Sequence, residues 1–485
     1  MKHYFPVFAV LGGVLMLFAL TMGVPLAFAL FGSDAALPAY GESIAATFTA
    51  GAALFFGCRR PRRELQPRDG FLLVTLVWTV LPAFGTLPLL LAIPGLTFTD
   101  AYFEAVSGLT TTGATVLTGL EHLPTSINVW RCFMVFMGGM GIIVLAVAIL
   151  PLLGVGGSQI FKAETPGPMK DDKLTPRIAE TARGLWAVYF AFALCCFFAY
   201  RLAGMGWADA FMHMCSTMGL GGFSSYDASF GHFDSPAIES VAIVFMLLSG
   251  VNFALYFMVW KRRSVAALWQ DAEARMFFLV MGGAVLLVAL FLTAHGVYAG
   301  FGESLRRAAF NVVSVATTTG FATVDYALWP AFAPVLMLFL CCFATSAGST
   351  GGGIKMIRAI LLVKQARREL TRIVHPRAVV PVTLRGGIVD NQVLFSVLAF
   401  MLVYGAVMVG ATLLLLFSGL DMVSAFTAVI ACINNTGPGL GQVGPSGNFQ
   451  GLSDFQTWVC TATMLLGRLE LFAVLVLFTP AFWRK

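Results

Sequence analysis

Apolar stretches long enough to cross a membrane recur along the whole chain, and they constrain its fold more than any other feature. They are centred near residues 17, 47, 82, 140, 193, 248, 287, 347, 403 and 468. A hydrocarbon core about 30 Å thick is crossed by about 20 helical residues. Only 11% of the residues are charged, whereas about a quarter are charged in a soluble domain. A water-soluble fold is excluded, and we expect an all-α integral membrane protein embedded in the lipid bilayer.

Lys and Arg residues gather in short blocks between alternate apolar stretches. The blocks lie at the termini and at 58–69, 154–183, 261–275 and 355–385. The positive-inside rule places these connections, and both termini, in the cytoplasm. The net charge of +6 therefore orients helices and indicates no nucleic-acid partner. We expect Asp171, Asp172 and their basic neighbours to form a solvated cytoplasmic face, with docking to a partner as the alternative.

The first apolar stretch and the cysteines have ordinary interpretations. The stretch from about residue 4 to residue 31 is too long for the hydrophobic region of a signal peptide, so we expect a retained membrane helix. The nine cysteines include no CxxC pair, and we interpret them as small buried hydrophobic residues.

Four shorter, semi-polar segments, all on the side opposite the basic blocks, align with one another without a gap. They read DAYFEAVSGLTTTGA, DAFMHMCSTMGLGGF, RAAFNVVSVATTTGF and SAFTAVIACINNTGP, with aligned glycines at Gly113, Gly222, Gly320 and Gly437. An apolar stretch precedes and follows each segment. Small residues that merely ease helix packing would not explain the shared spacing. We predict four tandem helix–pore-loop–helix repeats around one pore, at 70–155, 183–262, 274–365 and 386–485, after two N-terminal transmembrane helices at 1–57.

Each segment is too short to cross the bilayer, so we expect a half-helix that enters from outside and returns as extended backbone. Such backbone is tolerated at membrane depth only where it lines water or is buried in protein. The inward-pointing carbonyl end of a half-helix favours cations, and rings of backbone carbonyls replace the hydration shell of a large monovalent cation. We expect Asp100 and Asp209 to cap the first two half-helices. Glu104, His213 and Asn311, which share one repeat position, are interpreted as packing hydrogen-bond partners rather than ion ligands.

Two further features lie near the cytoplasmic side of the third and fourth repeats. The second helix of the third repeat contains the glycine-rich stretch 342–353, and because glycine costs about 1 kcal/mol inside a helix, we expect it to unwind. GSTGGGIK lacks the GK[ST] ending of a phosphate-binding loop, so nucleotide binding is not favoured. Arg468, at membrane depth, is a functional candidate, with a structural pair to Glu470 as the alternative.

The filter strings resemble those of a known family. LTTTGATV at 109–116, GGFS at 221–224, TTTGF at 317–321 and NNTGPGLG at 434–441, together with GGMGIIVLAVAILP, PRIAET, AGSTGGGIK, HPRAV and GRLE, are similar to the Trk/Ktr/HKT superfamily of cation transporters. The likeness is closest to the bacterial TrkH/TrkG-type membrane subunit. It implies a homodimer with one pore per protomer, a cytosolic TrkA-like ring of nucleotide-binding regulatory subunits, and a place in the bacterial inner membrane.

The resemblance also implies the site residues. Glycine at the first filter position, here Gly113, accompanies potassium selectivity, whereas serine accompanies sodium preference in some plant members; the second repeat, which lacks the threonine run, is the weakest match. The implied K⁺-binding filter consists of Thr111, Thr112, Gly113, Leu220, Gly221, Gly222, Thr318, Thr319, Gly320, Asn435, Thr436 and Gly437. The implied gate, an intramembrane loop with the arginine that faces it, consists of Thr345, Ser346, Ala347, Gly348, Ser349, Thr350, Gly351, Gly352, Gly353 and Arg468.

We therefore expect a potassium channel-like transporter that also takes Rb⁺ and works either alone or as a symporter coupled to Na⁺ or H⁺. Its only bound cofactor would be the transported K⁺. The alternative is the potassium-translocating subunit of a P-type ATPase complex, which shares the four-repeat pore. An enzyme is not expected, because the sequence contains no HExxH motif, no paired catalytic carboxylates and no Ser/His/Asp grouping.

Overall fold

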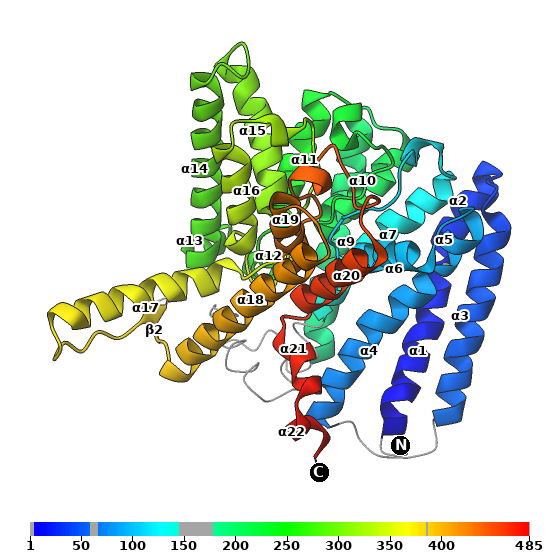
Figure 1. Ribbon diagram of the computed structural model, residues 1–485, viewed down its shortest axis with the longest axis horizontal. Helices are drawn as coiled ribbons and strands as arrows, with labels where there is room; N and C mark the ends of the chain where they lie inside the picture. The colour runs from blue at the N-terminus through cyan, green and yellow to red at the C-terminus, as the bar shows by residue number, and fades with distance from the viewer. Residues whose placement is uncertain (1–3, 59–65, 145–177, 385–386, 485) are drawn as a thin grey trace.

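The computed structural model describes residues 4–58, 66–144, 178–384 and 387–484, and most of these are helical (Figure 1). The all-α prediction is confirmed, with one short antiparallel pair, β1 (Thr383–Leu384) and β2 (Gly387–Ile388), as an addition. By length and composition, five described helices can span a membrane, or seven if two bent pairs are each counted as one span. Asp171, Asp172 and much of the basic blocks at 58–69 and 154–183 lie outside the described residues.

Two N-terminal helical segments precede the predicted repeats. They comprise α1 (Phe5–Thr21), continued after a break by α2 (Gly23–Gly32), and α3 (Leu37–Cys58). Pro25 lacks an amide hydrogen, which accounts for the interruption between α1 and α2. Helices α1 and α3 cross at Gly12 and Gly51, where a Cβ on Gly12 would lie 2.6 Å from the carbonyl oxygen of Gly51. The small residues thus allow a close backbone approach.

The remaining helices follow one pattern four times: a long helix, a short helix and a further helix. The first group comprises α4 (Pro67–Gly85), α5 (Leu87–Ala92), α6 (Phe98–Leu109) and α7 (Thr125–Val144). The second comprises α9 (Ile178–Leu202), α10 (Trp207–Gly219), α11 (Pro236–Ser249) and α12 (Phe253–Arg262). The third comprises α13 (Ala266–Gln270), α14 (Ala272–Ala294), α15 (Phe301–Ala316), α16 (Phe332–Phe343) and α17 (Met356–Val374). The fourth comprises α18 (Asn391–Phe417), α19 (Met422–Ile433), α20 (Asp454–Arg468), α21 (Phe472–Leu475) and α22 (Pro480–Trp483). The domain boundaries given above stay predictions.

The short helices α6, α10, α15 and α19 form a closed arrangement because each packs against a helix of the neighbouring group. Helix α10 contacts α7, α15 contacts α11, α19 contacts α16, and α6 contacts α20. This cyclic order brings together the segments that follow the carboxyl ends of the four short helices, although they lie far apart in the sequence.

Three of the second helices are interrupted, whereas the sequence predicted a break only in the third. The chain turns by 87° between α11 and α12, and by 105° between α20 and α21. The first turn is stabilised by Asn252, whose side chain accepts a hydrogen bond from Ala254 N and caps α12. The second turn contains Glu470 and Leu471, both with left-handed φ angles, of 55° and 56°. Continuous spans at these two places were therefore wrong.

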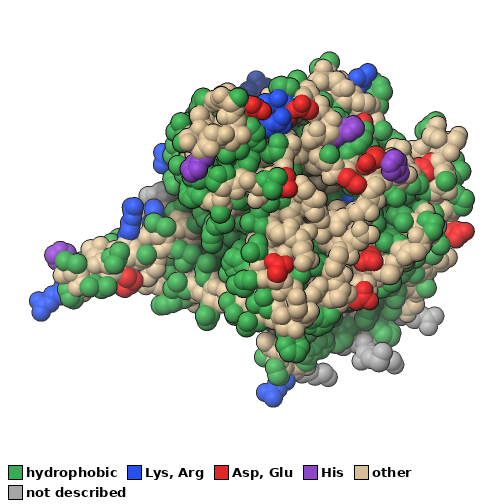
Figure 2. All heavy atoms as spheres, turned by 45° about the horizontal axis from the view of Figure 1, so that its top comes forward, with side chains coloured by type: hydrophobic (Ala, Val, Ile, Leu, Met, Phe, Trp, Pro, Cys, Tyr) green, Lys and Arg blue, Asp and Glu red, His purple; other side chains and the backbone are tan. Residues whose placement is uncertain are grey.

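The two ends of the described chain lie on the same side of the molecule. Helix α1 begins and α22 ends at the lower side of Figure 1, where α3 also ends and α4 begins, and α17 projects from the lower left. Figure 2 brings the opposite end forward and shows Asp and Glu side chains spread over that face. The cysteines form no disulfide, and most are buried as expected, but Cys195 is exposed on α9.

Candidate functional site

The four short helices end in segments with the same backbone conformation. The residue two places before each aligned glycine has a left-handed φ, between 53° and 63°; these residues are Thr111, Leu220, Thr318 and Asn435. The next amide donates a hydrogen bond of 2.8–3.0 Å to a carbonyl in the preceding helix. The pairs are Thr112 to Ser107, Gly221 to Ser216, Thr319 to Ser314, and Thr436 to Ala431. The gapless sequence alignment therefore corresponds to equivalent geometry, including in the weakly matching second segment.

The aligned glycines meet in a closed ring. A Cβ on Gly113 would lie 2.3 Å from Gly222 N, and one on Gly222 would lie 2.7 Å from the carbonyl carbon of Gly320. A Cβ on Gly320 would overlap the carbonyl oxygen of Thr436, at 2.0 Å, and one on Gly437 would lie 2.7 Å from the carbonyl oxygen of Thr112. Each predicted filter segment therefore contacts the next, around a common axis, and leaves no room for a side chain.

The second segment departs from the other three at its glycine. Gly113, Gly320 and Gly437 have positive φ angles of 78°, 87° and 96°, whereas Gly222 lies outside the left-handed region. The threonine pairs Thr110–Thr112 and Thr317–Thr319 are linked by hydroxyl hydrogen bonds of 2.7 and 2.8 Å in the first and third segments. The sequence of the second segment, Gly219-Leu220-Gly221, offers no hydroxyl at these positions.

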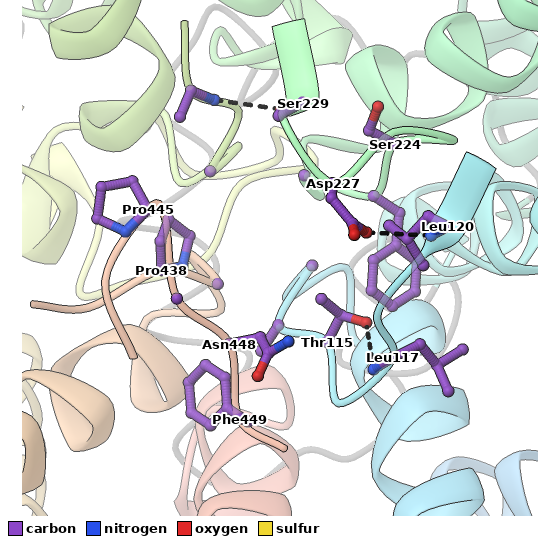
Figure 3. Close-up of a pocket in the computed structure, with 18 of the residues that line it drawn as sticks. Thr115, Leu117, Leu120, Ser224, Asp227, Ser229, Pro438, Pro445, Asn448 and Phe449 are labelled. Atoms are coloured by element: carbon purple, nitrogen blue, oxygen red, sulfur yellow. Dashed lines mark hydrogen bonds between the residues drawn. The ribbon is translucent and has the colours of Figure 1, made fainter. Parts of the chain in front are cut away.

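Above the ring lies a cavity of about 210 Å³ on the side that faces forward in Figure 2. The four ring glycines and the segments after them line it, and Figure 3 labels side chains from the first, second and fourth of these segments. Figure 3 shows Asp227 turned toward Leu120, where its carboxylate accepts hydrogen bonds from Gly119 N at 2.7 Å and Leu120 N at 3.1 Å. A hydrated ion entering from this side would meet a polar, preformed funnel.

In each short helix, a polar side chain forms hydrogen bonds with the extended segment that follows the ring glycine. These four extended segments are called the filter strands, although they form no β-sheet. The pairs are Glu104 with Thr115 and Val116, His213 with Ser224, Asn311 with Thr323, and Thr427 with Leu440. Their separations are 2.9–3.2 Å. Glu104, His213 and Asn311 thus contact protein groups, in keeping with the packing interpretation. Thr427, one position earlier in the fourth repeat, was not identified from the sequence because Ala428 stands at the aligned position.

The predicted helix caps at Asp100 and Asp209 were wrong. The N-cap of α6 is Thr97, whose hydroxyl accepts from Asp100 N at 3.1 Å, and Asp100 lies in the first turn. The N-cap of α10 is Gly206 and makes no side-chain cap bond. The Asp209 carboxylate instead accepts hydrogen bonds from Ser225 Oγ and the Tyr226 hydroxyl, at 3.1 and 3.3 Å. It therefore ties the short helix to the segment after the ring.

Several buried oxygens at the ring lack a hydrogen-bond donor within the described protein. They are Thr111 Oγ1, Thr436 Oγ1 and Asn435 Oδ1. A buried polar atom without a partner is costly unless water or an ion satisfies it. These oxygens and the converging backbone suit a monovalent cation or its remaining water better than an apolar ligand.

The glycine-rich stretch is unwound, as predicted, and lies directly beneath the ring. Helix α16 ends at Phe343 and α17 begins at Met356. Gly352 N donates to Thr318 Oγ1 at 2.9 Å, and a Cβ on Gly352 would lie 1.9 Å from the carbonyl oxygen of Asn434. Thr350 Oγ1 donates to the Met218 carbonyl at 3.0 Å. The loop thus contacts the second, third and fourth segments.

Residues distant in sequence hold this loop, and sequence reasoning missed them. The Glu273 carboxylate, buried at the start of α14, accepts from Ala347 N at 2.8 Å and from Ile357 N at 3.2 Å. Ser346 N donates to the Gly250 carbonyl at 3.0 Å, and Phe253 N donates to the Gly348 carbonyl at 3.1 Å. The backbone at the bend between α11 and α12 therefore holds the loop in place through these two hydrogen bonds.

The remaining predicted loop residues stabilise its own shape. Thr345 Oγ1 donates to the Gly352 carbonyl at 2.7 Å, and Ser349 Oγ donates to the Ser346 carbonyl at 2.6 Å. A Cβ on Gly351 would lie 2.6 Å from Thr345 Cγ2. Gly348 and Gly353 have positive φ angles of 74° and 82°, which glycine adopts without steric cost.

Arg468 is buried and contacts the loop rather than Glu470. Its guanidinium donates to the Thr350 carbonyl at 2.9 Å and to the Gly138 carbonyl at 3.1 Å. Glu470 pairs with Arg358 at 2.8 Å. The alternative of an Arg468–Glu470 pair was therefore wrong, because the chain turns directly after Arg468. A second cation, Lys355, donates to the Gly351 carbonyl.

Comparisons with known proteins agree over the whole chain. The model of the TrkH family, described as a cation transport protein, matches residues 37–485. The chain is 46% identical over 484 residues to the Trk system potassium uptake protein TrkH of Escherichia coli K12, with all of both chains covered. It is 39% identical over 475 residues to TrkG of the same strain, covering 98% of this chain and 97% of the relative. The crystal structure of the potassium transporter TrkH from Vibrio parahaemolyticus superposes with a TM-score of 0.92, at 44% identity and full coverage of both chains.

Proposed function

This chain belongs to the TrkH family of cation transport proteins, and we propose on that premise that it takes up potassium through one K⁺-selective pore. The observation that carries the proposal is the closed ring of Gly113, Gly222, Gly320 and Gly437, each in backbone contact with the next. The family is one of transporters, so the expectation that the chain is not an enzyme is confirmed by this membership. The relatives' names support uptake by a Trk system and give no support to the ATPase-subunit alternative.

The ion path runs from the outer cavity through the ring. K⁺, or Rb⁺ in its place, sheds water and is coordinated by backbone carbonyls at Thr111–Gly113, Leu220–Gly222, Thr318–Gly320 and Asn435–Gly437. K⁺ is the transported substrate and no covalent cofactor takes part. The unpartnered oxygens of Thr111, Asn435 and Thr436 support a polar ligand at this depth.

The loop from Thr345 to Gly353 and the guanidinium of Arg468 form the gate. The loop lies across the lower end of the ring, and Arg468 adds a positive charge at its Thr350 carbonyl. For ions to pass, the loop must move aside. The hydrogen bond between Arg468 and the Thr350 carbonyl must then break, or Arg468 must move together with the loop. Because the loop is held by hydrogen bonds to separate helices rather than by an apolar core, a modest input of binding energy can displace it.

That input comes from a partner. The chain works as a homodimer with one pore per protomer and binds a cytosolic, nucleotide-binding, TrkA-like ring on the face where the chain ends lie. The words Trk system in the relatives' names support a multi-component assembly. In the bacterial inner membrane, both termini of this multi-pass protein are cytoplasmic.

The function is tested in a bacterium deficient in potassium uptake, grown at low external potassium with and without a co-expressed TrkA-like partner. We expect growth rescue that increases with the partner. Purified protein in liposomes should then take up ⁸⁶Rb⁺ without ATP hydrolysis, in competition with K⁺ more than with Na⁺. Failure to rescue growth by protein that is present in the membrane, or uptake that needs a co-purified ATPase subunit, would contradict the proposal.

A further inference from the structure

A buried ion pair lies at the wall of the outer cavity, and transport through the ring does not by itself require it. Glu104 in α6 and Arg131 in α7 are both fully buried, and Arg131 Nε and Nη2 each lie 2.7 Å from Glu104 Oε1. A buried pair of charges is weak support for stability, because desolvation offsets the attraction. Its contacts, rather than its charge alone, indicate what it does.

The Arg131 guanidinium joins two filter strands. Its Nη2 donates to Thr115 Oγ1 at 3.2 Å in the strand that follows Gly113, and its Nη1 donates to the Ser224 carbonyl at 3.1 Å in the strand that follows Gly222. It also lies 4.4 Å from the ring centre of Phe223. Asn128 accepts its remaining Nη1 contact at 3.0 Å, so the planar group is fixed on all sides.

Glu104 holds the first of these strands from the other side. Its carboxylate accepts from Thr115 Oγ1 at 3.0 Å and from Val116 N at 3.1 Å. The third and fourth repeats hold their strands with the neutral groups Asn311 and Thr427, each within its own repeat. The ion pair thus adds a link between two repeats, at the point where Gly113 and Gly222 are in backbone contact.

We propose that Glu104 and Arg131 are positioning residues for selectivity, because the ion pair clamps the first and second filter strands and fixes the distance between their carbonyls. The proposal rests on the potassium-uptake function proposed above. The turn of the second segment, Gly219-Leu220-Gly221, has no hydroxyl side chain, and Gly222 lies outside the left-handed region, so this segment lacks the threonine hydroxyl pair found in the first and third segments. A clamp at this strand compensates for the missing hydroxyl contacts.

The test compares two variants of the ion pair with a control variant of another ion pair. The double variant Glu104→Gln with Arg131→Met removes both charges together, which avoids an unpaired buried charge, and Arg131→Lys keeps the charge but loses the planar, forked contacts. The matched control is Glu239→Gln with Arg306→Met, because that pair joins α11 to α15 through two 2.8 Å hydrogen bonds and touches no filter strand. The readout is ⁸⁶Rb⁺ uptake in liposomes under K⁺ or Na⁺ competition, normalised to folded protein.

We expect the K⁺ over Na⁺ preference to fall at least tenfold in the clamp variants, with uptake retained, and to remain unchanged in the control pair. A wild-type preference in folded Arg131→Lys or in the folded double variant would overturn the clamp. A preference that falls equally in the control pair would overturn it as well, since the effect would then be general loosening. A wild-type protein without cation preference would instead refute the proposed function.

Discussion

Substitution of Gly113 by serine is the sharpest test of the glycine ring. The new Cβ would lie 2.3 Å from Gly222 N, 2.9 Å from Gly222 Cα and 3.1 Å from the carbonyl carbon of Gly221. All three contacts are backbone atoms, so no side chain can turn away to relieve them. The second strand must retreat by about 0.7 Å before the closest contact reaches 3.0 Å, and the carbonyls that it contributes must move with it.

The free-energy cost of replacing Gly113 by serine has two parts, and a control variant can separate them. Any non-glycine residue at φ of 78° costs about 1 kcal/mol, and overpacking against fixed backbone typically adds about 1–3 kcal/mol. Gly119 provides the matched control, because its φ is 64° but the nearest atom to its added Cβ lies 3.8 Å away. Gly119→Ser therefore carries the conformational cost without the overlap. A difference of about 2 kcal/mol at the ring corresponds to roughly thirtyfold in an equilibrium or rate ratio.

The assay measures ⁸⁶Rb⁺ uptake into liposomes with K⁺ or Na⁺ as the competitor, per folded molecule. We expect Gly113→Ser to lower the K⁺ over Na⁺ preference by tenfold or more, and Gly119→Ser to leave it unchanged. The reasoning is refuted if folded Gly113→Ser protein keeps the wild-type preference. An equal loss in both variants would also refute it, because the ring contact would then have no special part.

Three further predictions concern the proposed gate, the proposed topology and a helix cap. Arg468→Ala should raise ⁸⁶Rb⁺ uptake per folded molecule and weaken the dependence of uptake on the regulatory partner. The reason is that a unit charge acts on an ion 4 Å away with about 4 kcal/mol at an effective dielectric near 20. A lower yield of folded protein with unchanged uptake per molecule would indicate a structural role instead. Cysteines replacing Arg262 and Arg372 in a cysteine-free background should react with impermeant thiol reagents only from the cytoplasmic side. The hydrogen bond from Ser424 N lowers the pKa of Asp421, the N-cap of α19. The stabilisation that Asp421 gives to the folded protein is therefore present above the unfolded pKa near 4 and is lost as pH falls through the lower folded pKa. Asp421→Ala should cost about 1 kcal/mol at pH 7, and a thermal-unfolding difference that persists below pH 2 would contradict this.

The ring was accessible from sequence because its determinants are local and repeated. Four copies of one spacing identified the glycines, and the structure gives the left-handed conformation at the same offset in every copy, at Thr111, Leu220, Thr318 and Asn435. The capping residues were less accessible, because threonine and aspartate at nearby positions satisfy the same first-turn amides. At α6 the cap is Thr97, three residues before the predicted Asp100.

The support of the loop was not accessible, because it depends on contacts between residues far apart in sequence. Glu273 and Ala347 are separated by 74 positions, and nothing in either local pattern indicates the other. The bend after Ser249 likewise contains no proline that would indicate it in the sequence. At this bend the backbone forms hydrogen bonds with the loop at 345–353. The same applies to the turn after Arg468, which frees that side chain to reach Thr350 and Gly138.

The proposed filter and the proposed gate share a hydrogen bond, so we expect a change in one to affect the other. Thr318 has the left-handed conformation that shapes the third strand, and its hydroxyl accepts the amide of Gly352 in the loop. Displacement of the loop removes that donor and leaves the Thr318 hydroxyl to bind water or the passing ion. It also uncovers the Asn434 carbonyl, against which Gly352 packs without space for a side chain. We therefore predict that displacement of the loop changes the lower end of the ring, and that loop substitutions alter the rate of ion exit together with the occupancy of the innermost ion position.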